Sequence, residues 1–368
     1  EAGMDTKAFS DKFIAAFMED VKQLGVKPAT KNPRVIDYMD EIIDFVKVLV
    51  DKGFAYETNG DVYFRVAKSQ NYAKLANKTL ADLEVGASGR VDGEGEIKEN
   101  PLDFALWKSA KPGEVSWQSP WGEGRPGWHI ECSVMATTIL GDTIDIHGGG
   151  ADLEFPHHTN EIAQSEAKTG KTFANYWMHN GFVNVDNEKM SKSLGNFVTV
   201  HDMLKTVDGQ VLRFFLATQQ YRKPVNFTEK AVHDASVNLK YLKNTFTLPL
   251  TEEADAAELA KFKADFEAAM DDDFNTANGI TVIFDMAKWI NSGNYNQAVK
   301  DTFAKMLAVF GIVFEEEVLD ADIEALIEKR QAARANKDFA TADAIRDQLA
   351  AQGIKLLDTK DGVRWTRD

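Results

Sequence analysis

The sequence has little cysteine, no long apolar run and no secretory signal. One cysteine, Cys132, stands among 368 residues, which excludes an internal disulfide and favours a reducing compartment, the cytoplasm. No apolar run reaches the roughly 18 residues that a membrane helix needs. No segment has the basic start and apolar middle of a secretory signal. We therefore expect a cytoplasmic protein without a membrane span.

Basic residues are also scarce. Lys and Arg number 42 against 58 Asp and Glu, which gives a formal net charge of −16. A broad nucleic-acid surface needs many cations, so this total argues against a large footprint but leaves room for a local basic path. Hydrophobic residues make up 44% and charged residues 27%, as in ordinary globular proteins. The length predicts two or more domains.

Two helices and a hairpin are predicted at the start of the chain. Apolar spacing predicts a helix over 7–24 and another over 35–53, closed by Gly53. The apolar face of the first helix holds Phe9, Phe13, Ile14 and Phe17. Asn59-Gly60 lies between two β-rich arms and predicts a hairpin over 54–66. Residues 86–100 read as a Gly-rich loop, and residues 101–128 as an irregular connection.

The next stretch alternates between helix and strand, which indicates a parallel α/β sheet. The expected elements are a helix over about 130–140, a strand over 142–150, a helix over 155–170 and a strand over 175–185. Beyond them the pattern is helical, with an acidic linker over 251–258. Residues 322–354 predict a helix pair with Phe339, Ala342, Ile345 and Leu349 on one face, and a closing hairpin turns at Asp361-Gly362.

A candidate metal site surrounds the lone cysteine. His157 and Glu161 are four residues apart, so they share one face of the predicted helix, and Cys132 on the preceding helix could add a thiolate. Cysteine, histidine and glutamate are plausible zinc ligands, although a fourth ligand or an open position is needed. The alternative is that Cys132 is a small buried apolar residue, and that His157 and His158 are one core and one surface residue. A deaminase is disfavoured, because "HIE" is not followed by P-C-x-x-C.

Two further motifs suit a nucleotide. Gly148–Gly150 follow a strand and precede Asp152, a carboxylate that could bind ribose hydroxyls, although a tight turn is the simpler interpretation. In "KMSKS", Lys189 and Lys192 lie on a short polar loop that could close over phosphates; a solvated loop is the alternative.

Together these motifs resemble cysteinyl-tRNA synthetases, a family of class I aminoacyl-tRNA synthetases. "GRPGWHIECS", "DIHGGGADLEFPHHTNEIAQSEA" and "KMSKSLGN" carry the resemblance, and "DFALWK", "DDDFNTANGI" and "KDFATADAIRDQL" extend it over essentially the whole chain. It implies an α/β fold: the second half of a Rossmann-type nucleotide-binding domain with an inserted connective region, followed by an all-α C-terminal anticodon-binding region. The implied activity joins L-cysteine to its tRNA through a cysteinyl-adenylate.

The resemblance implies roles for individual residues. Cys132, His157 and Glu161 would be three of four zinc ligands, and Trp128 would line the amino-acid pocket. The aminoacyl-adenylate would be bordered by His147, Gly148, Gly149, Gly150 and Asp152. Lys192 would contact ATP, and Lys189 would position its loop. The expected cofactors are one zinc and ATP with Mg²⁺, and the expected partners are tRNA(Cys), L-cysteine and ATP, bound by a monomer.

The resemblance also implies a domain order. The expected segments are 1–34, a remnant of the first Rossmann half; 35–120, the connective insertion; 121–190, the second half with the zinc site; 191–240, the KMSKS loop and stem-contact region; 241–318, a helical bundle; and 319–368, the anticodon-binding subdomain. Arg222, Lys223, Arg364, Trp365 and Arg367 are candidate RNA contacts, with ordinary surface charge as the alternative.

One departure from the family concerns the start of the chain. The family's HIGH signature and its further cysteine, the fourth zinc ligand, do not occur in the sequence. We therefore expect an incomplete, inactive fragment with weak zinc retention. Two other functions stay open: a mycothiol-type ligase that joins cysteine to an amino-sugar, and a non-catalytic zinc- or tRNA-binding paralogue. The C-terminal "KDFATADAIRDQL" favours the synthetase over the first, and the KMSKS lysines argue against the second.

Overall fold

The computed structural model describes residues 6–78, 97–190, 195–315, 321–359 and 362–367. The chain forms two compact units, Glu1–Ile312 and Val313–Asp368. Among the described helices, none combines the length and the apolar character that crossing a membrane requires.

The first unit holds most of the helices. In chain order they are α1 (Thr6–Gln23), η1 (Val35–Tyr38), α2 (Met39–Asp51), η2 (Val66–Lys68), α4 (Trp128–Leu140), η3 (Glu154–His158), α5 (Thr159–Thr169), α6 (Val200–Met203), α7 (Gly209–Ala217), α8 (Glu229–Phe246), α9 (Ala256–Asp271), α10 (Thr276–Asn291) and α11 (Gln297–Val309). The helices predicted over 7–24 and 35–53 are confirmed, and Gly53 has the left-handed φ of +75° that ends the second.

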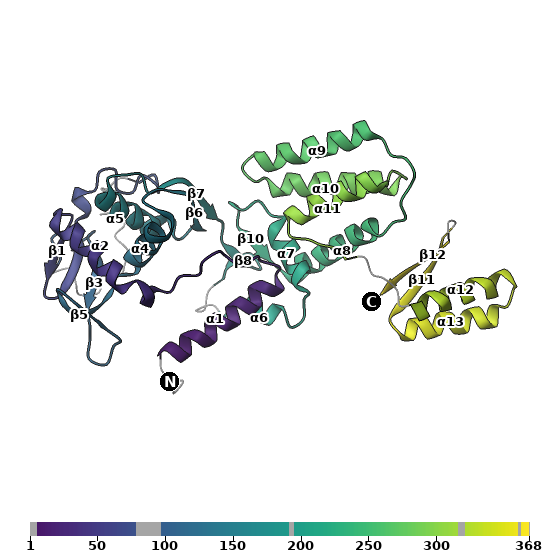
Figure 1. Ribbon diagram of the computed structural model, residues 1–368, viewed down its shortest axis with the longest axis horizontal. Coiled ribbons are helices and arrows are strands. Elements are labelled where there is room, and N and C mark those ends of the chain that lie inside the picture. The colour runs from purple at the N-terminus through teal and green to yellow at the C-terminus, as the bar shows by residue number, and fades with distance from the viewer. Residues whose placement is uncertain (1–5, 79–96, 191–194, 316–320, 360–361, 368) are drawn as a thin grey trace. The chain divides into compact units, whose positions relative to one another are not determined.

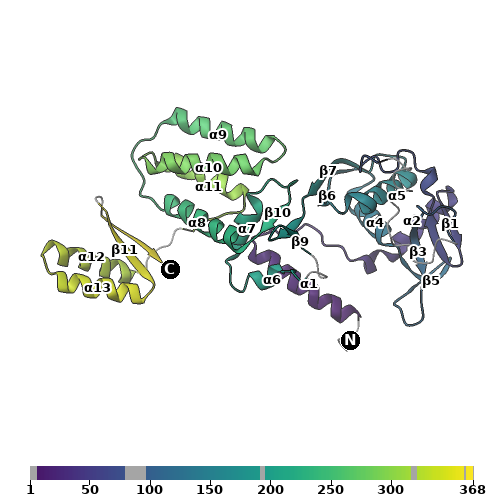
Figure 2. The same ribbon diagram turned by 180° about the vertical axis from the view of Figure 1, so that it is seen from behind.

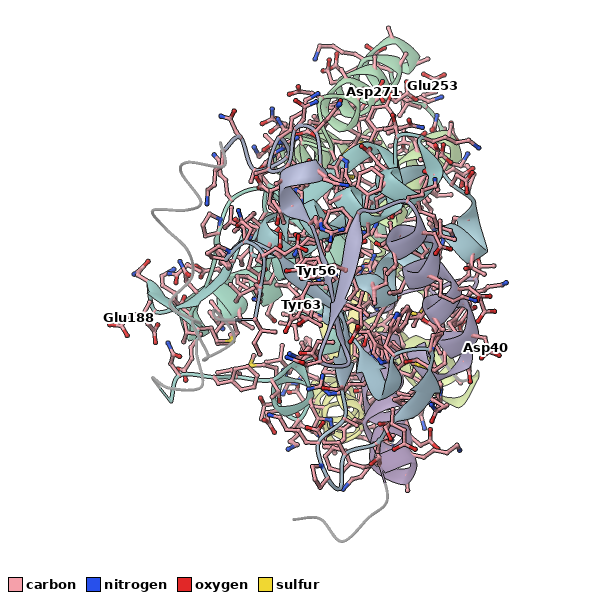
Figure 3. The ribbon with its side chains drawn as sticks, turned by 90° about the vertical axis from the view of Figure 1, so that its left-hand side faces the viewer. Asp40, Tyr56, Tyr63, Glu188, Glu253 and Asp271 are labelled. Carbon is pink, nitrogen blue, oxygen red and sulfur yellow. The ribbon has the colours of Figure 1, made fainter. Side chains whose placement is uncertain are left out.

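An antiparallel sheet with the strand order β1-β2-β3-β5-β4 dominates the N-terminal part of this unit. Its strands are β1 (Ala55–Thr58), β2 (Asp61–Phe64), β3 (Phe104–Ser109), β4 (Trp117–Ser119) and β5 (Gly122–Pro126). The hairpin at Asn59-Gly60 is confirmed, because both residues have positive φ and Thr58 pairs with Asp61. Tyr56 and Tyr63 lie side by side on the paired strands β1 and β2, with ring centroids 5.9 Å apart (Figure 3).

The interpretation of residues 101–128 as an irregular connection is wrong. They contain β3, β4 and β5, which pair with one another, and β3 also pairs with β2. These strands are short, β5 is interrupted by glycine and proline, and β3 pairs with a strand about 40 residues earlier in the chain, so their own sequence shows little period. Most of the loop predicted over 86–100 lies outside the described residues.

One apolar core joins this sheet to the helices that carry the candidate site. Ile42, Phe45 and Leu49 of α2 are at most 1% exposed and belong to the same cluster as residues of the sheet, α4 and α5. The other clustered side chains include Val62, Phe64, Leu106, Trp107, Ile130, Val134 and Ala163. Figure 1 shows α2, α4 and α5 beside strands β1, β3 and β5. The sheet and α2 thus form a rigid support for α4 and α5.

Parallel strands follow, as the alternating pattern predicts. β6 (Ile144–Gly150) and β7 (Ala174–Asn180) pair in parallel, and α5 lies between them in the chain order. The strand expected over 175–185 is split, because β8 (Val183–Val185) leaves β7 and pairs instead with β10 (Val225–Phe227) and β9 (Glu188–Lys189). Gly181 lies at this break, where an added Cβ would come within 2.3 Å of the Lys223 carbonyl oxygen. The chain can therefore turn here only with glycine.

The helical region of the first unit begins each helix with a side-chain cap. The oxygen of the residue before the helix accepts a backbone N–H in its first turn at Asp208, Thr228, Asp255, Asn275 and Asn296. Figure 2 shows α9, α10 and α11 stacked near α8. The predicted acidic linker is shorter than expected, since Asp255 already caps α9.

The first helix, α1, is amphipathic, and the described residues cover only part of its apolar face. Phe9, Phe13 and Phe17 are 44%, 56% and 60% exposed. Phe13 and Phe17 also line a hollow of ≈ 320 Å³ with Pro33 and Arg34.

The second unit packs two helices on a hairpin. Its elements are α12 (Ala321–Ala335), α13 (Phe339–Ala351), β11 (Ile354–Thr359) and β12 (Gly362–Arg367). Ala342, Ile345 and Leu349 are buried as predicted, but Phe339 is 61% exposed, because it is the first residue of α13. The closing hairpin is confirmed, with Thr359 paired to Gly362; the turn residue Asp361 lies outside the described residues.

Candidate metal centre and nucleotide site

The position of Cys132 is set by the entry into α4. Gly127 precedes this helix, and a Cβ there would lie 2.0 Å from the Ala105 carbonyl oxygen, so only glycine fits. Cys132 is half-buried in the second turn of α4. Burial, with the carboxylates Glu161 and Glu131 nearby, raises the pKa of Cys132 to about 12. By itself the side chain is therefore a thiol at neutral pH, and a bound cation would be needed to hold it as a thiolate.

The predicted pairing of His157 and Glu161 is present. His157 Nε2 lies 2.9 Å from Glu161 Oε1, and the two residues are 4% and 1% exposed. The helix expected from residue 155 begins as α5 only at Thr159, and the turn η3 before it carries His157. The two side chains nevertheless face the same point, as residues one helical turn apart should.

Glu161 has the surroundings of a metal ligand. Its second oxygen, Oε2, lies 3.0 Å from His147 Nε2. Neither imidazole contact is aligned as a hydrogen bond, so both oxygens are buried without a hydrogen-bond partner among the described residues. Burial alone would raise the pKa of Glu161, but the His147 and His157 imidazoles outweigh burial and lower the pKa to about 2. Glu161 is therefore a buried carboxylate at neutral pH, which calls for a cation.

The donor atoms fit zinc. One donor atom from each of Cys132, His157 and Glu161 lies within 4.8 Å of the other two. Sulfur, imidazole nitrogen and carboxylate oxygen are the ligand types that zinc binds, at roughly 2.0 to 2.3 Å. The three donors leave a fourth coordination position for another ligand, as in reactive zinc sites. A second group, His147, His158 and Glu161, meets the same distance criterion and shares the carboxylate.

Further histidines surround this centre, and sequence reasoning missed them. His129 Nδ1 lies 2.9 Å from His157 Nδ1, and His158 Nδ1 lies 2.8 Å from His179 Nε2. Burial lowers the pKa of His129 and of His158 to about 4, so both rings are neutral at pH 7. The suggestion that one of His157 and His158 is a surface residue is wrong, since His158 is only 2% exposed. The HH pair itself was the signal that could have revealed this cluster.

Trp128 lies beside the donor group, and its role in an amino-acid pocket stays a prediction. Its ring centroid is 4.4 Å from that of His157, and the residue is 56% exposed. One part of the indole thus covers a candidate ligand while another part stays open to a small molecule.

The structure brings the glycine motif to the same centre. His147 lies on β6 and contacts Glu161, so it belongs to the donor cluster. A Cβ on Gly149 would lie 2.8 Å from His158 Cε1, and one on Gly150 would lie 2.4 Å from Asp152 Oδ1. Gly149 therefore gives His158 room, while Gly148 and exposed Asp152 make no contact with the three donors that any described interaction shows. Their role toward a nucleotide stays a prediction.

The lysine motif is only partly described. Lys189 ends β9, where its backbone pairs with Asn184. Lys192 lies outside the described residues. Among the RNA candidates, Arg222 is already paired with Asp273, and the side chains of Arg364 and Arg367 lie outside the described part of the chain.

Family models match almost the whole chain. Residues 1–237 match the catalytic domain of class I (C) tRNA synthetases, residues 265–315 a DALR domain, and residues 316–365 a cysteinyl-tRNA ligase anticodon-binding domain. The last match covers the segment on which we expected a synthetase to differ from an amino-sugar ligase.

Relatives of known name agree with these models. The chain is 86% identical over all 368 residues to the cysteine–tRNA ligase of Streptococcus agalactiae serotype V, and covers 82% of that protein. It is 82% identical to the corresponding ligase of Streptococcus thermophilus, with the same coverage.

Solved structures show the same fold at low identity. The methionyl-tRNA synthetase of Mycobacterium tuberculosis matches with a TM-score of 0.57 and 14% identity, over 84% of this chain and 77% of that one. A putative arginyl-tRNA synthetase from Campylobacter jejuni matches with a TM-score of 0.55 and 14% identity, over 84% and 68%. The fold is a class I synthetase catalytic domain followed by DALR and anticodon-binding domains, and the chain belongs to the cysteinyl-tRNA synthetase family, the enzymes that charge tRNA with cysteine.

Proposed function

We propose that Cys132, His157 and Glu161 hold a zinc ion that selects cysteine, and that the full-length enzyme activates this cysteine with ATP and Mg²⁺ as a cysteinyl-adenylate. The observation that carries this proposal is the buried carboxylate of Glu161, whose oxygens have no aligned hydrogen bond among the described residues although a thiol and an imidazole lie beside it. Family membership supports the use of tRNA and ATP.

The need for a metal follows from the discrimination problem. Serine differs from cysteine by one atom, and an apolar pocket separates such near-isosteres by only about 1–3 kcal/mol. When bound, zinc supplies a soft cation that prefers a thiolate sulfur to a hydroxyl oxygen and favours the thiolate at neutral pH. Glu161 and the Cys132 thiolate offset the ion's charge, while His147 and His129 hold Glu161 and His157 in place.

The other residues have positioning and electrostatic roles in this proposal. Trp128 walls the amino-acid pocket beside His157. Gly148–Gly150 let the adenylate approach β6, and Asp152 accepts bonds from the ribose hydroxyls. Lys192 contacts ATP and Lys189 helps to position its loop, and the charge of these lysines stabilises the negative charge that develops as the cysteine carboxylate displaces pyrophosphate. We place this activity in a cytoplasmic monomer.

A serine substitution at Cys132 tests the proposal. In the full-length protein, Cys132→Ser should lower zinc content and raise serine-dependent pyrophosphate exchange relative to cysteine-dependent exchange. Thr137→Ala is a matched control, because Thr137 is a half-buried residue of α4 outside the donor group, and its hydroxyl donates to carbonyl oxygens of α4 itself. A Cys132→Ser protein with stoichiometric zinc and unchanged selectivity would refute the ligand assignment.

A further inference from the structure

The turn between α9 and α10 has an unusual backbone. Asp273 and Phe274 both have φ of +53°, in the left-handed region that side chains other than glycine rarely adopt. Phe274 is 51% exposed, so core packing does not hold it there. A strained backbone of this kind persists only where neighbouring contacts fix it, and it often marks a functional position.

Backbone hydrogen bonds within residues 268–276 shape this turn, and the described side-chain hydrogen bonds that reach it from elsewhere in the chain come from a single distant segment. Asp273 Oδ1 accepts a hydrogen bond from Tyr221 Oη at 2.9 Å, and Asp273 Oδ2 accepts one from Arg222 Nε at 2.7 Å. Thr276 Oγ1 donates to the Gln219 carbonyl oxygen at 2.7 Å. We call these three contacts the turn clamp. They tie the helical region to residues 219–222.

Stability alone does not account for the turn clamp. The side chains of Arg222 and Asp273 are 60% and 45% exposed, and exposed ion pairs add little to the stability of a fold. The small stabilisation from such an ion pair does not offset the conformational cost of two strained residues, so the pair should have a role besides stability.

The clamped segment is also bonded to the hairpin of β8 and β9, which ends at Lys189 and which we call the lysine hairpin. The Tyr221 carbonyl accepts from Gly181 N–H at 2.7 Å, and Val225 N–H donates to the Phe182 carbonyl at 2.8 Å. From there β10 pairs with β8, and Asn226 Oδ1 accepts from Asn187 N–H at 2.7 Å in the β8–β9 turn. The hairpin that ends at Lys189 is thus attached to residues 221–227 along its length.

We propose that Asp273 is a positioning residue for the lysine hairpin. Through Tyr221 and Arg222 it fixes the segment that pairs with β8, and because β8 pairs with β9, it also sets the backbone position of Lys189 at the end of β9. The effect on catalysis rests on the role proposed for the lysines; the mechanical coupling between Asp273 and the hairpin does not.

Asp273→Gly separates positioning from stability. Glycine relieves the left-handed strain and removes the carboxylate, so the melting temperature should not fall. Amide hydrogen exchange over residues 181–189 should nevertheless become about tenfold faster, because the hairpin loses its support. In the full-length protein, the KM for ATP in pyrophosphate exchange should rise about tenfold while the KM for cysteine stays the same. Asp273→Asn, which keeps an acceptor for Tyr221, should restore part of both.

Two controls isolate the clamp. Asn59→Gly relieves the same backbone strain in the β1–β2 turn, and Asp265→Asn removes an equally exposed ion pair with Lys261 on α9. Neither should change exchange over 181–189. Unchanged exchange in Asp273→Gly would overturn the proposal. If Lys189→Ala raises the KM for ATP and Asp273→Gly does not, the lysine has its proposed role but Asp273 does not position it. If Lys189→Ala leaves the KM for ATP unchanged, the proposed role of the lysine is wrong, and hydrogen exchange alone then tests the coupling between Asp273 and the hairpin.

Discussion

Two buried carboxylates in the first unit show opposite solutions to the same problem. Asp103, beside β3, is 2% exposed, and it accepts hydrogen bonds from Tyr56 Oη and from the backbone N–H groups of Val66 and Asn100. Glu161, at 1% exposure, has no aligned donor among the described residues. The fold itself satisfies the carboxylate of Asp103 with hydrogen-bond donors, whereas the carboxylate of Glu161 needs a cation to compensate its charge. Hydrogen-bond satisfaction, more than burial, thus separates a structural carboxylate from a binding one.

The largest effect that this comparison predicts is on metal content. Glu161→Gln keeps the side-chain volume but removes the charge, so the zinc retained after gel filtration should fall by at least about 10–100-fold. This is the loss of metal affinity typical when a residue that only supports a ligand is changed, and Glu161 is a proposed ligand itself. Elemental analysis of the purified variant measures this directly. Asp103→Asn serves as the control and should retain as much zinc as the unaltered protein. Equal zinc in both variants would erase the distinction between the two carboxylates.

Asp103→Asn should act on stability instead. The amide cannot accept from all three donors, and one buried group left unsatisfied costs about 1–3 kcal/mol. Urea denaturation, followed by the tryptophan fluorescence of the first unit, should show this loss in the free energy of unfolding. A variant as stable as the unaltered protein would mean that the Asp103 network is dispensable.

The smallest predicted effect concerns a third carboxylate, Asp358 of the second unit. Arg330 lowers its pKa to about 2, against the opposing effect of burial and with help from Arg334. Because this pKa is lower in the folded unit than in the unfolded chain, the unfolded chain takes up the proton first as pH falls. The stabilisation is therefore complete above about pH 4 and lost between about pH 4 and pH 2.

The Asp358 side chain is 44% exposed, so solvent screening should keep the pH-dependent part at about 1 kcal/mol or less. The stability difference between the unaltered protein and Asp358→Asn should shrink by that amount as the pH is lowered over this range. A difference that stays constant down to pH 2 would show that the Arg330 pair does not titrate with folding.

Local chemistry made part of the fold predictable. Asn59-Gly60 fixes a tight turn by its own backbone preferences, and His157 and Glu161 meet because they are one helical turn apart. Long-range pairing did not show in the sequence. The strands over residues 104–126 gain their stability from β2 and from one another, and they are too short, with glycine and proline in β5, to show a clear alternation.

The candidate site divides in the same way. Cys132, His157 and Glu161 could be named from residue types and spacing, whereas His129 and His179 join the cluster only through folding. The contact of His147 with Glu161 depends on the parallel register of β6 and β7 and on how α5 packs, which no local pattern encodes. Phe339 shows the converse error: helical spacing placed it on the buried face, but it stands at the helix end, beyond its partners.

The most direct test of the central claim is zinc K-edge X-ray absorption on the zinc-loaded 368-residue chain, whose one cysteine is Cys132. The account predicts one sulfur neighbour at about 2.3 Å with nitrogen or oxygen neighbours at about 2.0–2.2 Å, and a second sulfur once L-cysteine is added. Cys132→Ser should remove the first sulfur. A zinc signal with no sulfur neighbour, or one that Cys132→Ser leaves unchanged, would contradict it.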